Sequence, residues 1–283
     1  MSALKIGFVG LGDQGAPMAE AISDAGLELH VWARRAQSFD AISGAKYLRH
    51  DNLESLAAVV DVLSLCLRDD ADIWDLIKRQ RIIEALRPGT ILVNHGTGDP
   101  AENERIARFL AQSGIRFLDA PVSGGRPGAV ARALTTLVGG DIKDFERCRE
   151  VFETFSRKVA HMGLVGSGQM TKLLNNAMTM TNLKNAVDVF ALARKGGIDI
   201  PKLYDVITVS SGSSAVLQSI GRQIGSKAAV HIQGLMHKDI EHFAEDMRAR
   251  GQDPGSVRDR GLGGANGVVE LAQWIEGESR FSE

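Results

Sequence analysis

The chain has 283 residues, of which 44% are apolar and 24% charged, and its formal net charge is −2. This composition is typical of a globular protein with one large or two modest domains. The near-neutral charge disfavours nucleic acid and anionic membrane surfaces as partners, and no apolar run reaches the length of a membrane span.

Cys66 and Cys148 are the only cysteines, and their separation fits neither a disulfide framework nor a metal-binding motif. His237 and His242 lie five residues apart, which does not place them on one helical face, so no metal site is expected. The N-terminal residues run directly into an apolar strand without a secretory signal pattern. We therefore expect a reducing, cytoplasmic setting.

A glycine-rich loop follows the first predicted strand, Lys5–Val9. It reads Gly10-Leu11-Gly12-Asp13-Gln14-Gly15 and precedes a predicted helix over Ala16–Ala25. A G-x-G-x-x-G motif between a strand and a helix indicates a dinucleotide-binding loop rather than an ordinary strand–helix turn. We expect the helix N-terminus to bind the pyrophosphate, with cofactor contacts from Gly10, Leu11, Gly12, Gln14 and Gly15.

The second predicted strand, Glu28–Trp32, is followed by Ala33-Arg34-Arg35. An NAD-specific fold usually has an acidic residue here, which binds the ribose 2′-hydroxyl. Guanidinium groups can instead bind a 2′-phosphate, so Arg34 and Arg35 predict NADP(H), with NAD(H) disfavoured. The alternative is that both arginines are solvated surface charges.

Strands and helices continue to alternate as far as residue 139. The predicted elements are strands at Val59–Leu67, Thr90–Asn94, Ile115–Asp119 and Ala133–Gly139, and helices at Ile73–Leu86 and Ala101–Ser113. This alternation predicts an α/β, Rossmann-type doubly wound parallel sheet. Ligands of such sheets bind beyond the carboxyl ends of the strands. That edge would include the Gly10–Gly15 loop, Leu67-Arg68, Asn94–Thr97 and Asp119–Gly125.

Strand patterns mostly stop after His161, and a glycine-rich joint at Gly163–Gly168 precedes a long predicted helix, Gln169–Lys195. Further helices are predicted at Pro201–Val209, Ser214–Ile224, Gln233–Arg250 and Gly267–Glu276. The sequence therefore predicts an NADP-binding domain over residues 1–162. An all-α domain over 163–283, joined through the long interdomain helix, would serve substrate binding and dimerisation.

Lys172, Asn175 and Asn176 fall in the first turns of the long predicted helix, and their spacing places them on one face. A lysine near the cofactor could act as general acid/base, and burial is expected to lower its pKa from the ordinary value of about 10.4. Helical spacing alone favours a surface lysine, so this assignment depends on the sequence pattern that follows.

Four blocks in order resemble the β-hydroxyacid dehydrogenase family, which includes 3-hydroxyisobutyrate dehydrogenases, tartronate semialdehyde reductases and glyoxylate/succinic semialdehyde reductases. They are G-F-V-G-L-G-D-Q-G-A-P-M-A at 7–19, D-A-P-V-S-G-G at 119–125, G-S-G-Q-M-T-K-L-L-N-N at 166–176 and L-M-H-K-D-I at 235–240. The resemblance covers essentially the whole chain. It implies hydride transfer between NADP(H) and a small 3-hydroxy acid, semialdehyde or 2-oxo acid.

The resemblance also implies individual roles. Lys172 would be the general acid/base, while Asn176 would orient the substrate with support from Asn175. The substrate carboxylate would bind Ser123, Gly124 and Gly125, much as an anion binds a backbone nest. The cofactor would be contacted by Arg34 at its 2′-phosphate, by Thr97 beside the nicotinamide and by Lys238 from the helical domain.

Some positions depart from the family pattern. Arg68 replaces a common proline, and Arg132 begins a pair that replaces Gly-Thr. His95 and His231 could contribute to an unusual substrate pocket, although a structural or solvent-facing role is favoured for any single histidine. Two alternative functions are an imine reductase and a non-catalytic NADPH-binding protein. Apolar helix faces in a small domain further predict a homodimer or homotetramer.

Overall fold

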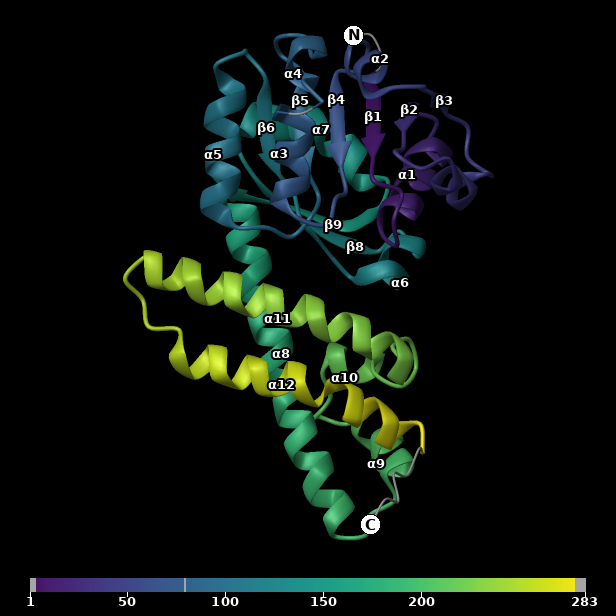
Figure 1. Ribbon diagram of the computed structural model, residues 1–283. Coiled ribbons are helices and arrows are strands. Elements are labelled where there is room, and N and C mark those ends of the chain that lie inside the picture. The colour runs from purple at the N-terminus through teal and green to yellow at the C-terminus, as the bar shows by residue number, and fades with distance from the viewer. Residues whose placement is uncertain (1–3, 79, 278–283) are drawn as a thin grey trace. The chain divides into compact units, whose positions relative to one another are not determined.

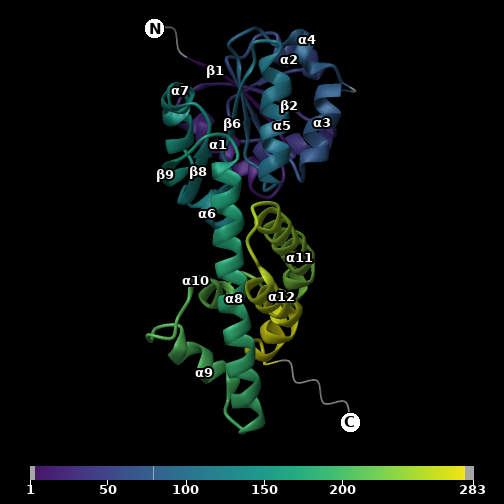
Figure 2. The same cartoon turned by 90° about the vertical axis from the view of Figure 1, so that its left-hand side faces the viewer.

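The computed structural model describes residues 4–78 and 80–277, and the chain divides into two compact units, Met1–Lys172 and Leu173–Glu283. Unit 1 contains the sheet and unit 2 is helical (Figures 1 and 2). Helix α8 (Ser167–Lys195) contributes its first turn to unit 1 and its remainder to unit 2. None of the helices within the described ranges combines the length and apolarity that a membrane span requires.

The sheet of unit 1 has the order β3-β2-β1-β4-β5-β6-β8-β7, and β9 pairs with β8. Its strands are β1 (Lys5–Val9), β2 (Glu28–Trp32), β3 (Leu48–Arg49), β4 (Val62–Leu65), β5 (Ile91–Asn94), β6 (Arg116–Asp119), β7 (Val122–Ser123), β8 (Leu134–Gly139) and β9 (Ser156–Gly163). The first six strands pair in parallel, whereas β8 runs antiparallel to β6 and β7. The chain leaves β1 in one direction for β2 and β3 and returns for β4, so a ligand-binding crevice opens between β1 and β4.

Helices cover both faces of this sheet, as the alternating pattern predicts (Figure 2). One face carries α2 (Leu53–Ala57), α3 (Asp70–Lys78), α4 (Ile82–Ala85) and α5 (Pro100–Ala111). The other carries α1 (Gly15–Asp24) and α7 (Ile142–Glu153), and the short helices α6 (Gly125–Val130) and η1 (Ala36–Ile42) complete unit 1. Each face has its own apolar core, so the sheet is buried on both sides.

Unit 2 comprises the rest of α8 with α9 (Ile200–Ile207), α10 (Ala215–Ser219), α11 (Ser226–Ala249) and α12 (Gly255–Ile275). The predicted starts of α11 and α12, at residues 233 and 267, were too late. In α12, glycines concealed the helix because they serve packing: a Cβ at Gly264 would lie 2.1 Å from the Met180 carbonyl oxygen of α8. Close helix approach therefore overrides the low helix propensity of glycine.

Two further predictions were wrong in detail. The single helix expected over Ile73–Leu86 is two helices, α3 and α4, and Arg81 between them has a left-handed φ of +50°. Strand β9 was missed because it lies at the sheet margin, where half-exposed positions weaken the apolar signal. The loop arrangement at the carboxyl edge of the sheet is unaffected by either difference.

His95 is a core residue of unit 1 rather than part of a pocket wall. Its ring is 2% exposed and packs against Phe8, Phe152 and Phe155. One ring nitrogen pairs with the Ala120 carbonyl oxygen at 3.0 Å and the other with the Ser64 hydroxyl at 3.3 Å. Burial lowers the pKa of His95 from 6.5 to about 4.

This burial makes the protein acid-sensitive. Because the folded-state pKa is depressed, the unfolded chain binds the proton first, and stability is lost as pH falls from 6.5 towards 4. The full loss attributable to His95 is about 3 kcal/mol. Urea denaturation between pH 7.5 and 4.5 measures it, and His95→Gln should flatten the pH dependence. His231→Gln, at an exposed position on α11, is the matched control and should leave the slope unchanged.

Candidate cofactor and substrate site

The glycines of the Gly10–Gly15 loop have two different roles, one in packing and one in leaving space beside the backbone. A Cβ at Gly10, whose φ is +102°, would lie 2.2 Å from the Cys66 carbonyl oxygen, and a Cβ at Gly15 would lie 1.9 Å from that of Gly10. Both positions therefore need glycine for packing. A Cβ at Gly12 would meet nothing within 4 Å, so open space adjoins the backbone where α1 begins. This open space beside the N-terminus of α1 fits a pyrophosphate bound by backbone N–H groups.

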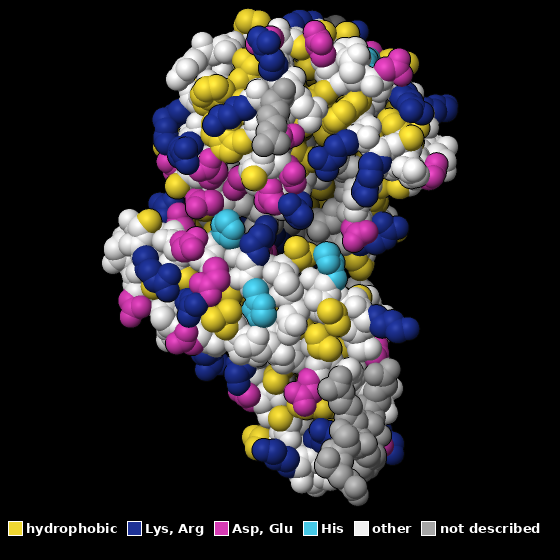
Figure 3. All heavy atoms as spheres, viewed as in Figure 1, with side chains coloured by type: hydrophobic (Ala, Val, Ile, Leu, Met, Phe, Trp, Pro, Cys, Tyr) yellow, Lys and Arg dark blue, Asp and Glu magenta, His cyan; other side chains and the backbone are white. Residues whose placement is uncertain are grey.

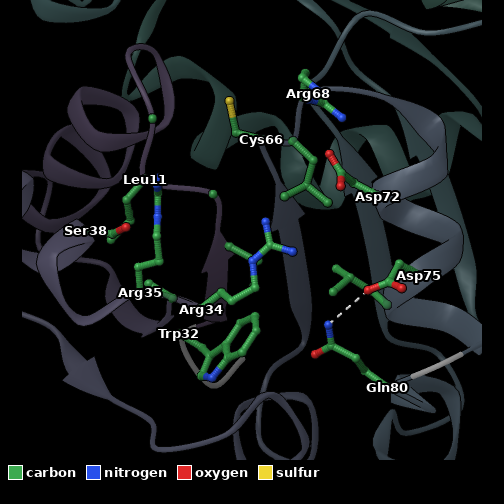
Figure 4. A pocket seen from close by; sticks show the side chains of 16 residues that line it. Leu11, Trp32, Arg34, Arg35, Ser38, Cys66, Arg68, Asp72, Asp75 and Gln80 are labelled. Atoms are coloured by element: carbon green, nitrogen blue, oxygen red, sulfur yellow. Dashed lines mark hydrogen bonds between the residues drawn. The ribbon is translucent and has the colours of Figure 1, made fainter.

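A cavity of about 290 Å³ adjoins this loop and lies between the ends of β2 and β4 and helix α3. Figure 4 shows Arg34 and Arg35 on the β2 side, with Leu11 and Ser38 near Arg35. Asp72 and Asp75 come from α3 on the opposite side, where Gln80 donates a hydrogen bond to Asp75 at 3.3 Å. The β2 side thus carries two guanidinium groups, whereas the α3 side carries two carboxylates with Arg68 beside Asp72.

Six residues that the sequence predicted to contact the cofactor line this cavity, namely Gly10, Leu11, Gly12, Arg34, Arg35 and Leu67. Sequence reasoning missed other lining residues, namely Trp32, Ser38, Asp72, Asp75 and Gln80. The sequence could have indicated Asp72 and Asp75. They lie three residues apart, and therefore on one face, in the helix that follows the buried strand β4, whose carboxyl end borders the predicted ligand site. Gln14 of the glycine loop does not line the cavity, and it immediately precedes α1.

The loop after β5 contains Thr97 and is held by a buried polar network. Asp70, at the start of α3, accepts hydrogen bonds from the Asp99 backbone N–H at 2.8 Å and from the Asn103 amide at 3.0 Å. The Asn103 side-chain oxygen in turn accepts from Asn94 at 2.8 Å. These bonds fix the loop against the β4–α3 connection, so Thr97 is presented on a rigid segment.

Asp119 ends β6 and anchors the start of α8. Its carboxylate oxygens accept hydrogen bonds from the backbone N–H groups of Gly166 and Gln169, both at 2.8 Å. Burial raises the pKa of Asp119 to about 7, while these backbone donors oppose that rise by favouring the charged form. A Cβ at Gly168 would lie 2.6 Å from the Asp119 carbonyl oxygen, so the G-S-G block lets the helix approach the strand.

The segment Asp119–Gly125, which the family resemblance predicts to bind the substrate and which is called the substrate loop here, ends in Ser123, Gly124 and Gly125. Gly124 and Gly125 have φ values of +131° and +59°, which only glycine adopts easily. The next residue, Arg126, donates a hydrogen bond at 3.3 Å to the carbonyl oxygen of Asp13 in the Gly10–Gly15 loop. Because Pro17 has no N–H to donate to that carbonyl group within α1, Arg126 supplies the missing donor and ties the two loops together.

Lys172 lies in the first turns of α8 within unit 1 and is 9% exposed. Asn175, Asn176 and Lys238 belong to unit 2. There the Asn176 amide donates to Asp239 at 2.7 Å and receives a 3.3 Å hydrogen bond from Asn175. Lys238 Nζ lies 3.6 Å from the carboxylate of the same Asp239, so these polar residues form one cluster.

Three other departures from the family pattern also have definite positions. Arg68 is exposed, forms an ion pair with Asp69 at 3.0 Å and lines the cavity beside the glycine loop. Arg132 pairs with Asp24 and has a left-handed φ of +52°, which explains why glycine is usual there. His231 is exposed on α11.

Within residues 4–78 and 80–277, His, Cys, Asp and Glu side chains nowhere gather in threes that could hold a metal ion. On the face in Figure 3, basic and acidic side chains are interspersed. Fold and loop geometry together define a dinucleotide-binding protein of the Rossmann class.

Comparison with known proteins narrows that class. Residues 5–166 match the NAD binding domain of 6-phosphogluconate dehydrogenase, and residues 166–253 match the NAD-binding domain of NADP-dependent 3-hydroxyisobutyrate dehydrogenase. An NAD-dependent L-serine dehydrogenase from Pseudomonas aeruginosa is 31% identical, over 76% of this chain and 72% of the relative.

Two solved structures share the fold. A 3-hydroxyisobutyrate dehydrogenase from Salmonella typhimurium has a TM-score of 0.82 at 22% identity, covering 96% of this chain and 99% of the other. An imine reductase from Myxococcus stipitatus has a TM-score of 0.66 at 17% identity, covering 97% and 100%. The chain belongs to the β-hydroxyacid dehydrogenase family. It is an NAD(P)-dependent oxidoreductase of the type that acts on CH–OH groups.

The open space beside Gly12 generates a prediction. Gly12→Ala creates no clash within the protein, so the free energy of unfolding should change by less than about 1 kcal/mol. Its methyl group would occupy the approach of the pyrophosphate, so the Kd of NADPH should rise at least about tenfold. Fluorescence titration of NADPH measures the affinity. Gly44→Ala, also without a close neighbour, is the control, and equal affinities in both variants would contradict this account.

Proposed function

We propose that this protein interconverts a small carboxylate-bearing 3-hydroxy acid and its semialdehyde, or the corresponding 2-oxo acid, using NADP(H) and Lys172 as the general acid/base. One observation carries the proposal: the buried Lys172 belongs to the same compact unit as the glycine loop, the Thr97 loop and the substrate loop. Asp119, at the end of β6, accepts hydrogen bonds from the start of α8, and Gln169 of α8 binds the loop that contains Thr97. This arrangement supports a site in which a cofactor, a substrate carboxylate and a proton donor would lie close together.

The role proposed for each group follows from its chemistry. The bound nicotinamide supplies or accepts the hydride. The backbone N–H groups of Gly124 and Gly125, with the Ser123 hydroxyl, would hold the substrate carboxylate and so orient the reacting carbon. During reduction the Lys172 ammonium would donate a proton to the carbonyl oxygen, and during oxidation the neutral amine would remove it from the hydroxyl group.

The preference for NADP(H) rests on the cationic wall of the cavity. The end of β2 contributes two guanidinium groups, Arg34 and Arg35, where an NAD-specific protein would place a carboxylate. A 2′-phosphate can accept several charge-assisted hydrogen bonds from such groups. The carboxylates of Asp72 and Asp75 lie on the α3 side and would disfavour a phosphate next to them, so the arginine pair after β2 is the proposed position of the 2′-phosphate.

Imine reduction and cofactor binding without catalysis are the rival functions. The likeness between this chain and the imine reductase is a likeness of the backbone fold alone. Lys172 and the Ser123–Gly125 turn are the features that a carbonyl reductase needs and a simple binding protein does not. Their presence in one unit with the cofactor loop supports the dehydrogenase.

We assign cofactor binding to unit 1, and further substrate contacts and self-association to unit 2. Within unit 2, Asn175 and Asn176 would orient and support the substrate, and Lys238 would contact the cofactor. Exposed apolar side chains follow one face of α8, at Leu174, Met178, Val189 and Leu192. Such a face is usually buried against a partner subunit, which supports a homodimer or homotetramer.

Replacing the proposed proton donor tests the reaction. Lys172→Ala should lower kcat by at least ~10²-fold, the usual contribution of a general acid/base, while NADPH binding persists. Absorbance at 340 nm with a panel of semialdehydes, oxo-acids and imines identifies the substrate in the unmodified enzyme. Lys195→Ala, at the end of the same helix, is the matched control. Undiminished turnover of Lys172→Ala would refute the mechanism, and turnover of imines alone would favour the imine reductase.

Replacing the cationic wall tests the cofactor. Arg34→Ala should lower kcat/KM for NADPH relative to NADH at least about tenfold, because a hydrogen bond to a charged group contributes about 1.5–3 kcal/mol. The ratio is measured with both cofactors at one substrate concentration. Arg132→Ala, whose side chain pairs with Asp24 away from the cavity, should leave the ratio unchanged. A ratio equal in Arg34→Ala and the parent protein would refute the assignment.

A further inference from the structure

Gln169 is a fully buried amide that forms hydrogen bonds on both sides of Thr97. Its side-chain oxygen accepts from the Gly98 backbone N–H at 2.9 Å, and its side-chain nitrogen donates to the Gly96 carbonyl oxygen at 2.8 Å. The amide therefore binds the Thr97 loop much as a neighbouring strand would. Both polar atoms of the amide are used, which specifies glutamine rather than any residue of similar size.

The Thr97 loop has little room to move away from this amide. A Cβ at Gly96 would lie 2.6 Å from the Leu67 carbonyl oxygen, and one at Gly98 would lie 2.2 Å from the Asp70 carboxylate. The loop is thus held between the β4–α3 connection on one side and Gln169 on the other. Its backbone position relative to α8 depends directly on the two amide hydrogen bonds.

The backbone of Gln169 makes the second connection. Its N–H donates to Asp119 at 2.8 Å, and Asp119 begins the substrate loop. Lys172 follows Gln169 by three residues on the same helix, which places the two side chains on neighbouring sides of one turn. One residue therefore joins the Thr97 loop, the substrate loop and the turn that carries Lys172.

We propose that Gln169 is a positioning residue that sets the Thr97 loop, and hence the nicotinamide ring, in register with Lys172. This inference rests on the proposed role of Lys172. Hydride and proton must reach one carbonyl group from two different structural segments, and a displacement of about 1 Å can cost ~10²-fold in rate. Rigid linkage through a buried amide would keep that error small without contact between Gln169 and the substrate.

Two substitutions separate this role from simple packing. Gln169→Met fills a similar volume but cannot form either hydrogen bond, so kcat should fall at least about tenfold. The Kd of NADPH should change less than about threefold, because the glycine loop and Arg34 are untouched. A primary deuterium isotope effect with 4-deuterated NADPH should increase, since a misplaced hydride donor makes the chemical step more rate-limiting.

Gln169→Glu provides a readout that altered packing would not produce. Its carboxylate can accept from Gly98 but would oppose the Gly96 carbonyl oxygen, whereas the protonated acid can donate to it. Activity relative to the parent enzyme should therefore rise as pH falls. Thr136→Val is the control for lost buried hydrogen bonding, because Thr136 pairs with Ser156 at 2.7 Å within β8 and β9. It should lower stability without lowering kcat of the folded protein.

The results expected for Gln169→Met, Gln169→Glu and Lys172→Ala distinguish the positioning role of Gln169 from the proposed function itself. A kcat for Gln169→Met within twofold of the parent enzyme overturns the inference, as does a loss that only matches the unfolded fraction. Where Gln169→Met does not fold, a pH-independent activity ratio for Gln169→Glu overturns it instead. Full activity of Lys172→Ala would reject the proposed function itself. An inactive Lys172→Ala beside an active Gln169→Met would reject only the positioning role.

Discussion

The attachment of α8 to the end of β6 is the constraint on which the site depends. Asp119 places a buried carboxyl group at the N-terminus of α8, where backbone N–H groups and the helix dipole oppose its desolvation but do not cancel it, because its pKa is still raised to about 7. Without this contact the backbone N–H groups of Gly166 and Gln169 would lose their acceptor, and the attachment of α8 to β6 would be weakened. With it, Lys172 belongs to the same compact unit as the Gly10–Gly15 loop, the Thr97 loop and the Ser123–Gly125 turn. The part of the candidate site that lies in unit 1 is therefore held together by hydrogen bonds of the protein itself.

Glycine serves two distinct purposes in this architecture. At Gly10, Gly15 and Gly168 a side chain would collide with a backbone carbonyl oxygen, so these glycines permit strands, loops and helices to touch. At Gly12 a side chain would meet no other protein atom, so glycine at this position leaves space for a ligand and is not needed for packing. Packing and binding can thus be separated experimentally within one short motif.

The cavity beside the glycine loop has opposed charges on its two walls. The arginine wall follows from two consecutive residues after β2, whereas the carboxylate wall comes from one face of α3. Under the proposed function, the arginine pair would attract a phosphate and the two carboxylates would disfavour its approach to α3, which would orient the ligand. Arg68 adds a third guanidinium group to the rim while remaining paired with Asp69.

The sequence by itself determined the α/β architecture, the dinucleotide loop and the family, since strand–helix alternation and glycine spacing are local patterns. It did not reveal the start of α12, where glycines serve contact with α8, or β9 at the sheet margin. Only the tertiary structure decided that His95 is a core residue, that Arg126 serves a carbonyl oxygen left by Pro17, and that Gln169 binds the Thr97 loop. Each of these facts depends on atoms brought together from distant parts of the chain, and spacing in one sequence carries no information about such distances.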